Sequence, residues 1–159
     1  MSAEAGSLAE VVASSRLALL VAPAAALASV DLLVKATVPT DWWAFHHRSG
    51  GWVVLSVALL IGAFALTAVP SRAVALAAGI MSAGVLGNLL SARWDGNWVP
   101  NPLTVSAHGY SIAFNLADVY FLVGNLLLMA ALMAVTLRHR DRLLPPRAWE
   151  RALLERLRL

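Results

Sequence analysis

Four long apolar stretches constrain this chain more than any other feature of its sequence. They cover roughly residues 17–34, 52–69, 73–91 and 114–137, and each approaches the ~20 residues that a helix needs to cross a bilayer. Because lipid offers no hydrogen-bond partner, a spanning segment satisfies its backbone internally as a helix. The composition agrees, with 60% hydrophobic and only 13% charged residues. We therefore predict an all-α membrane protein with four transmembrane helices.

The first span permits a second interpretation. The run "LALLVAPAAALAS" contains Pro23 and also matches the apolar core of a cleaved signal peptide. A signal peptide carries net positive charge before this core, whereas here Glu4 and Glu10 precede the single Arg16. This charge balance favours a retained transmembrane helix.

The basic residues predict the orientation of the spans. By the positive-inside rule, a cluster of Lys and Arg beside the last span places the C-terminal tail in the cytoplasm. Four spans then put the N-terminus on the same side, with extracytoplasmic loops at about 35–51 and 92–113. Seven of the twelve basic residues form that cluster: Arg138, Arg140, Arg142, Arg147, Arg151, Arg156 and Arg158.

The tail is predicted to be a separate unit. We divide the chain into a four-helix transmembrane domain over 1–140 and a cytoplasmic, basic amphipathic helix over 141–159. In the tail, Trp149, Leu153 and Leu157 recur at i, i+4 and i+8 opposite a face of Arg and Glu. Such a helix binds anionic lipid headgroups, and a partner-binding helix is the alternative. No nucleic-acid partner is expected.

Polar residues in or beside the spans are the candidate functional residues, because ionisable groups are costly in lipid. Asp31 and Lys35 close the first span at i and i+4, a spacing that allows an ion pair. Asn88 lies among small residues of the third span, where it can bond to another helix. Asn115 and Asp118 begin the fourth span on one helical face. Each set also has a purely structural explanation: an ion pair, helix packing, and a first-turn acid.

Asp118 gains a second interpretation if another carboxylate lies close to it. Two carboxylates that share one proton activate water in aspartic proteases. The chain has no cysteine, which excludes a thiolate metal site and a cysteine nucleophile. We expect neither a metal nor a cofactor.

The stretch "FNLADVYFLVG" resembles the F-N-x-A-D-(5)-G signature of the lipoprotein signal peptidases, or signal peptidase II. Asp31 and Lys35 match the D-x-x-x-K at the end of that family's first span. The family's G-N-x-x-D-R-x-x-x-G-x-V-x-D stretch is matched at Gly87, Asn88 and Gly96. The resemblance covers roughly residues 15–137 and implies a multi-pass protein of the bacterial cytoplasmic (inner) membrane. The fourth-span matches are Phe114, Asn115, Ala117, Asp118 and Gly124.

The resemblance implies a catalytic dyad of two aspartates, and only one of them is present. Asp118 stands at the position of the first. The second falls on Pro100, with Asn101 beside it, and neither residue can be a catalytic acid. The family's D-R pair is replaced by Ser91 and Ala92. The chain is therefore predicted to be a degenerate member.

Another acid could replace the missing one, and Asp95 is the first candidate. It precedes Gly96 in the loop after the third span, and Asn88, Ser91 and Asp95 share one face if that helix continues far enough. Further candidates are Asp31 and Asp41, with His108 as an alternative general base.

Two functions from different classes follow from the resemblance. The first is a non-catalytic subunit or adaptor that binds a lipid, a lipidated peptide or another integral membrane protein. The alternative is an aspartic endopeptidase that cleaves prolipoprotein signal peptides with Asp118 and Asp95. In either case Asn115 is expected to orient Asp118. The predicted site support comes from Asn88, Asp31, Lys35 and Ser91.

Overall fold

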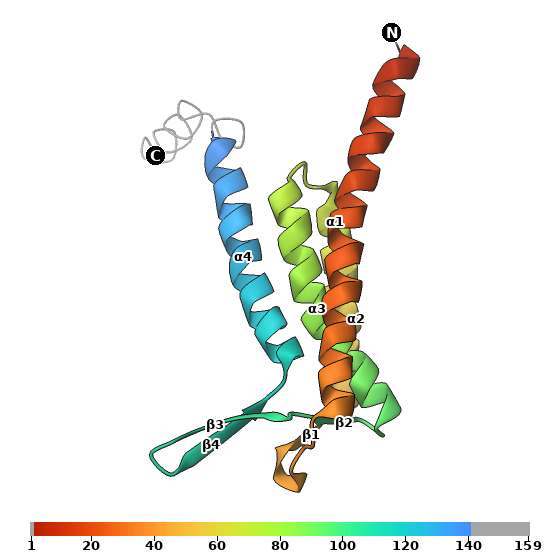
Figure 1. The fold of residues 1–159 in the computed structure, drawn as a ribbon. Helices are drawn as coiled ribbons and strands as arrows, with labels where there is room; N and C mark the ends of the chain where they lie inside the picture. Colours follow the sequence, from red (N-terminus) through yellow and green to blue (C-terminus); the bar gives the residue numbers. More distant parts are fainter. Residues whose placement is uncertain (1, 141–159) are drawn as a thin grey trace, which may run out of the picture.

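The computed structural model describes residues 2–140, so the predicted tail helix over 141–159 lies outside the described residues. Four long helices make up most of this part of the chain (Figure 1). Their apolar stretches Ala13–Thr37, Gly50–Ala68, Arg72–Trp94 and Leu116–Arg138 are each long enough to cross a membrane. The prediction of four transmembrane helices is confirmed. The helices are α1 (Ser2–Thr37), α2 (Gly50–Ala65), α3 (Arg72–Trp94) and α4 (Leu116–Arg138).

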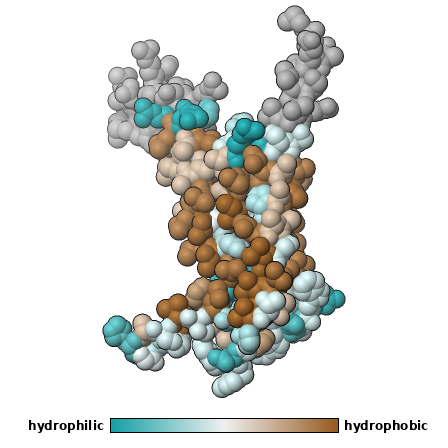
Figure 2. Space-filling model, in the orientation of Figure 1, coloured by the Kyte–Doolittle hydropathy of each residue, from teal (hydrophilic) through white to brown (hydrophobic). Residues whose placement is uncertain are grey.

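The surface of the bundle agrees with this assignment. Figure 2 shows a broad apolar belt around the helices, with hydrophilic residues gathered towards the two ends. Apolar side chains that point away from a protein core in this way are covered by lipid in a membrane-spanning protein. An even number of spans also leaves the start of α1 and the end of α4 at the same end of the bundle (Figure 1).

Helix α3 is the centre of the bundle and packs against the other three helices. Small residues make this possible, because they let helix backbones approach closely. A side-chain carbon at Gly79 would lie 2.6 Å from the Leu20 carbonyl oxygen and 2.8 Å from Pro23 of α1. On the opposite face, Gly84 of α3 and Gly124 of α4 allow the equally close contact of these two helices.

Serine caps explain where α2 and α3 begin. The Ser49 hydroxyl accepts a hydrogen bond from the backbone N–H of Trp52 at 3.2 Å, and the Ser71 hydroxyl accepts one from that of Val74 at 3.4 Å. Each bond satisfies one of the backbone donors that the first turn of a helix leaves free. A 3-10 turn, η2 (Leu66–Ala68), and Pro70 connect the two helices at the opposite end.

The two long loops contain short strands that the sequence analysis does not anticipate. After the 3-10 turn η1 (Trp42–Ala44), strand β1 (Phe45–His47) pairs antiparallel with β2 (Trp98–Pro100), with Phe45 opposite Pro100. Strand β3 (Leu103–Ala107) pairs with β4 (Tyr110–Phe114). All four strands lie at one end of the bundle (Figure 1), which we call the strand end.

Strands β3 and β4 form an amphipathic hairpin that extends sideways from the bundle (Figure 1). Its two-residue turn has positive φ at both His108 (52°) and Gly109 (81°), as a type I′ hairpin turn requires. The register stacks apolar cross-strand pairs on one face and pairs Ser106 with Ser111 on the other. The apolar pairs are Leu103 with Phe114, Val105 with Ile112, and Ala107 with Tyr110.

Candidate functional site

A continuous hydrogen-bonded cluster of polar side chains occupies the strand end, where α1, α3, α4 and β2 meet. We call it the polar junction. It includes five of the seven site residues predicted from the sequence. The sixth member is Asn101, which stands beside the position of the missing catalytic acid. The members are Asp31, Lys35, Asn88, Asn101, Asn115 and Asp118.

Asp31 and Lys35 form an ion pair on α1, as their spacing predicted. Asp31 Oδ2 lies 2.7 Å from Lys35 Nζ, and both side chains are almost fully buried. Asp31 Oδ1 accepts a hydrogen bond from the backbone N–H of Ala117 at 2.8 Å. The carboxylate therefore neutralises a buried cation and also satisfies a free donor of the first turn of α4.

Asn88 of α3 uses both ends of its amide to join α1 to α4. Its Oδ1 accepts from Lys35 Nζ at 2.8 Å and from Asn115 Nδ2 at 3.0 Å. Its Nδ2 donates to Asp118 Oδ1 at 2.9 Å. A buried polar side chain on one helix with partners on two others fixes how the three helices sit against one another.

Asn115 and Asp118 form a capping box at the start of α4. Asn115 Oδ1 accepts from the Asp118 backbone N–H at 2.9 Å, and Asp118 Oδ2 accepts from the Asn115 backbone N–H at 3.2 Å. The reciprocal bonds satisfy two backbone donors that a helix start leaves free. Each oxygen of Asp118 thus accepts one hydrogen bond. This first-turn role is the structural explanation given for Asp118 above.

Asn101 occupies the region where the resemblance places a second acid, and it is only 1% exposed. Its Oδ1 accepts from Asn115 Nδ2 at 2.5 Å, and its Nδ2 donates to His46 Nδ1 at 2.8 Å. His46 therefore accepts on Nδ1, which places the proton of the neutral ring on Nε2. The pairing of β1 with β2 holds Asn101 here, since its backbone N–H donates to the Ala44 carbonyl at 3.1 Å.

The structure does not bring Asp95 into the polar junction. Helix α3 ends at Trp94, so Asp95 is its exposed C-cap and does not continue the buried face of Asn88 and Ser91. Asp95 lines a separate cavity with Lys35 and Ser91. No hydrogen bond or ion pair links the Asp95 and Asp118 side chains within residues 2–140.

The remaining candidates lie at the surface. Asp41 is the exposed residue that precedes η1 and makes no capping bond with its side chain. His108 is at the exposed tip of the β3–β4 hairpin. In the described part of the chain, no group of three or more His, Cys, Asp or Glu side chains is arranged to hold a metal ion.

Asp118 and Asn88 also line a cavity that opens between α2, α3 and α4. Its volume is about 300 Å³, and a second cavity of about 450 Å³ continues along the same helices. Leu55 and Leu59 of α2 line both, so we treat the two as one α2–α4 groove. The groove has a polar end at Asp118 and a mostly apolar remainder in which Ser56 and Asn125 are the polar exceptions. The apolar part includes Phe121, Gly62, Ala63, Met81 and Leu128.

Arg48 is a residue of this groove that the sequence analysis missed. It precedes α2, and its guanidinium carbon lies 5.0 Å from the centre of the Trp52 ring. Both side chains line the groove with Asp118. The i, i+4 spacing of Arg48 and Trp52 could have indicated their contact from the sequence. Their position near Asp118 depends on long-range packing, which the sequence does not show directly.

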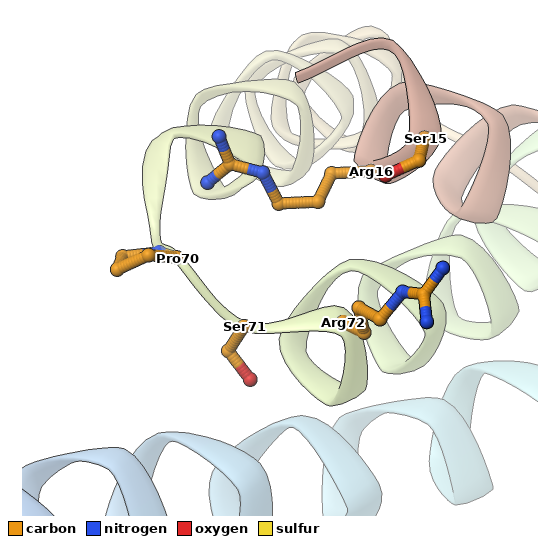
Figure 3. Close-up of a pocket in the computed structure, with 5 residues that line it drawn as sticks. All are labelled: Ser15, Arg16, Pro70, Ser71 and Arg72. Carbon is orange, nitrogen blue, oxygen red and sulfur yellow. The ribbon is translucent and has the colours of Figure 1, made fainter. Parts of the chain in front are cut away.

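A smaller cavity lies at the other end of the bundle, between the start of α3 and α1 (Figure 3). Arg16 extends from α1 along the α2–α3 turn in this view. Its Nη1 donates to the backbone carbonyls of Val69 at 2.9 Å and Ala68 at 3.3 Å. Arg16 thereby links α1 to the backbone of the α2–α3 turn.

Comparisons with known proteins support the fold alone. No protein-family model and no curated protein sequence matches the chain. A solved structure of a bacterial membrane enzyme is similar, with a TM-score of 0.54 and 19% sequence identity, over 72% of this chain and 87% of that chain. The described residues therefore adopt a multi-pass membrane fold, and an enzyme has a similar fold.

Proposed function

We propose that this chain is a signal-peptidase-II-like membrane protein that binds a lipid or a lipidated peptide in the α2–α4 groove without cleaving it. In this role it serves as a subunit or adaptor in the bacterial inner membrane, with both termini in the cytoplasm. The observation that carries the proposal is the amide of Asn101, which is buried against Asn115 next to Pro100, the position at which the resemblance expects a second acid.

Aspartic protease chemistry needs two carboxylates close enough to share a proton. The groups bonded to Asp118 are amide donors, namely the side chain of Asn88 and the backbone of Asn115. An amide cannot take up and release the proton as a second carboxylate does. Removal of a catalytic group typically costs several orders of magnitude in rate. A site built in this way is suited to binding.

The shape of the groove supports an amphiphilic ligand. Its polar end at Asn88, Asp118 and Arg48 lies at the strand end, and mostly apolar side chains line the remainder. A head group at the polar end would leave an acyl chain alongside Leu55 and Leu59. Because the surrounding lipid is as apolar as these side chains, binding of the chain would depend on close packing in the groove and not on removal from water.

The proposal is tested by incubating the purified full-length protein, in lipid nanodiscs, with a synthetic diacylated prolipoprotein peptide. We expect the peptide to bind and to remain intact when the mixture is analysed by mass spectrometry. Cleavage that is lost in the Asp118→Asn and Asp95→Asn variants would establish the endopeptidase and overturn the non-catalytic assignment.

A groove-filling variant tests where the ligand binds. Leu59→Trp places a large side chain in the groove and is expected to weaken peptide binding about tenfold, the equivalent of about 1.4 kcal/mol. Val57→Trp is the matched control, because Val57 is on the same helix but does not line the groove. Equal affinity of both variants and the unaltered protein would place the ligand outside the groove.

A further inference from the structure

The Arg48 guanidinium has no hydrogen-bond or ion-pair partner within the described part of the chain. Its Nε is buried and makes no hydrogen bond, and its side chain forms no ion pair. Buried polar groups in folded proteins almost always have a partner, and an exception calls for an explanation. The side chain is nevertheless held in place, because it stacks on Trp52 and its backbone N–H donates to the Asn97 carbonyl at 2.7 Å.

Asp118 presents the opposite charge to the same cavity. Arg48 and Asp118 both line it, yet no ion pair joins them. Each Asp118 oxygen accepts a single hydrogen bond within the polar junction, and a carboxylate oxygen can accept two. The cavity therefore has an unpaired cationic donor and a carboxylate with remaining acceptor capacity.

The other buried charges of the site do not change the net charge that a ligand in this cavity meets. Asp31 and Lys35 neutralise each other across 2.7 Å. The charges of the two remaining residues, Arg48 and Asp118, also sum to zero. A ligand that complements both must carry an anionic and a cationic group and be neutral overall, because complementary charges determine which partner a site accepts.

We propose that the α2–α4 groove recognises a zwitterionic phospholipid head group. The phosphate would accept hydrogen bonds from the Arg48 guanidinium, whose planar donors suit phosphate oxygens. A primary ammonium would donate to Asp118, and an acyl chain would lie along Leu55, Leu59 and Leu128. This inference rests on the proposed function, because it requires that the groove take up an amphiphile.

The test compares lipids that have the same acyl chains and different head groups. Native mass spectrometry of the detergent-solubilised protein gives the affinity for phosphatidylethanolamine, phosphatidylglycerol and diacylglycerol. We expect phosphatidylethanolamine to bind at least ~10-fold more tightly than the other two, a difference of about 1.4 kcal/mol. Phosphatidylglycerol differs from phosphatidylethanolamine in having no ammonium group. Diacylglycerol differs in having neither the phosphate nor the ammonium group.

Two arginine variants complete the test. Arg48→Gln is expected to lower phosphatidylethanolamine affinity about 10-fold or more, since bonds to a charged group contribute about 1.5–3 kcal/mol. Within residues 2–140, the Arg48 side chain contacts Trp52 but makes no hydrogen bond or ion pair. Loss of that contact costs about 0.5–1 kcal/mol, so this variant is expected to unfold at a detergent concentration only slightly below that of the parent protein. Arg93→Gln is the control, because Arg93 is exposed and lies outside the groove.

Two results would overturn the inference in distinguishable ways. Equal binding of all three lipids, unchanged in Arg48→Gln, would refute head-group recognition and leave amphiphile binding in place. No binding of any lipid, together with no binding of the diacylated peptide, would refute the proposed function as well.

Discussion

Asp31 Oδ1 accepts a hydrogen bond at 2.8 Å from the backbone N–H of Ala117, which is 86 residues further along the chain. The bond fixes the end of the first transmembrane helix to the start of the fourth. With the Lys35 ion pair on its other oxygen, Asp31 has a structural role that accounts for a fully buried carboxylate without invoking catalysis.

The Asp31→Leu variant is expected to be strongly destabilised. It leaves the Lys35 ammonium buried without its counter-charge and removes the acceptor for Ala117. Breaking one partner of a buried pair costs about 3–5 kcal/mol. The measurement is the unfolding midpoint during titration of detergent micelles with dodecyl sulfate. The double variant Asp31→Leu with Lys35→Met should recover part of this loss, and a double variant less stable than Asp31→Leu would contradict the ion-pair explanation.

Gly87 is predicted to be intolerant of even one methyl group. A side-chain carbon there would lie 2.5 Å from Asp31 Oδ2 and 3.1 Å from the Ala117 side chain. Gly87→Ala should therefore lower the unfolding free energy by about 1–3 kcal/mol, as overpacking does. Gly62→Ala is the control, because nothing lies within 4 Å of the added carbon, and it should be neutral or stabilising. Equal behaviour of the two variants would disprove the tight junction at Gly87.

Asn115 combines a helix cap with amide bonds to other elements, and two substitutions separate these roles. Asn115→Ala removes the acceptor for the Asp118 N–H and the donors to Asn88 and Asn101. Asn115→Ser keeps a capping oxygen and loses only the donors. We expect the serine variant to be more stable than the alanine variant by about 1 kcal/mol, measured by the same titration. A serine variant no more stable than alanine would show that the cap contributes little.

The β3–β4 hairpin is predicted to place its apolar face in the membrane interface. Ile112 is 69% exposed on that face, Ser111 points to the other, and β4 leads into the membrane-spanning α4 through Asn115 alone. The chain has no cysteine, so Ile112→Cys and Ser111→Cys each give one labelling site. A fluorophore at 112 should be quenched by spin-labelled lipid much more than one at 111. Equal or reversed quenching would place the apolar face in water or against protein.

The spans were predictable because length and apolarity suffice to recognise a transmembrane helix. The exact ends of the spans were harder to predict. The fourth span was expected from residue 114 and begins at Leu116, because Phe114 pairs in β4 and Asn115 caps the helix. The strands were missed because they are three to five residues long, too short to show a clear alternation in sequence.

Local spacing also explains which parts of the site were predictable. The Asp31–Lys35 pair and the Asn115–Asp118 box involve neighbours on one helix, so their i, i+4 and i, i+3 spacings were visible. The partnership of Asn101 with His46, 55 residues apart, depends on the pairing of β1 with β2. No periodicity within one segment encodes a contact of that kind.

The pairing of β1 with β2 has a consequence for engineering. Its bonds are made by backbone atoms, which every residue except proline supplies in full, so the side chains next to it can be exchanged without removing the ladder. Arg48 follows β1 directly and lines the α2–α4 groove with Asp118, whereas Asn101 follows β2 directly and is bonded to Asn115 and His46. The ladder therefore holds Arg48 without using its side chain, and ligand preference could be redesigned at this position while the four-helix scaffold stays unchanged.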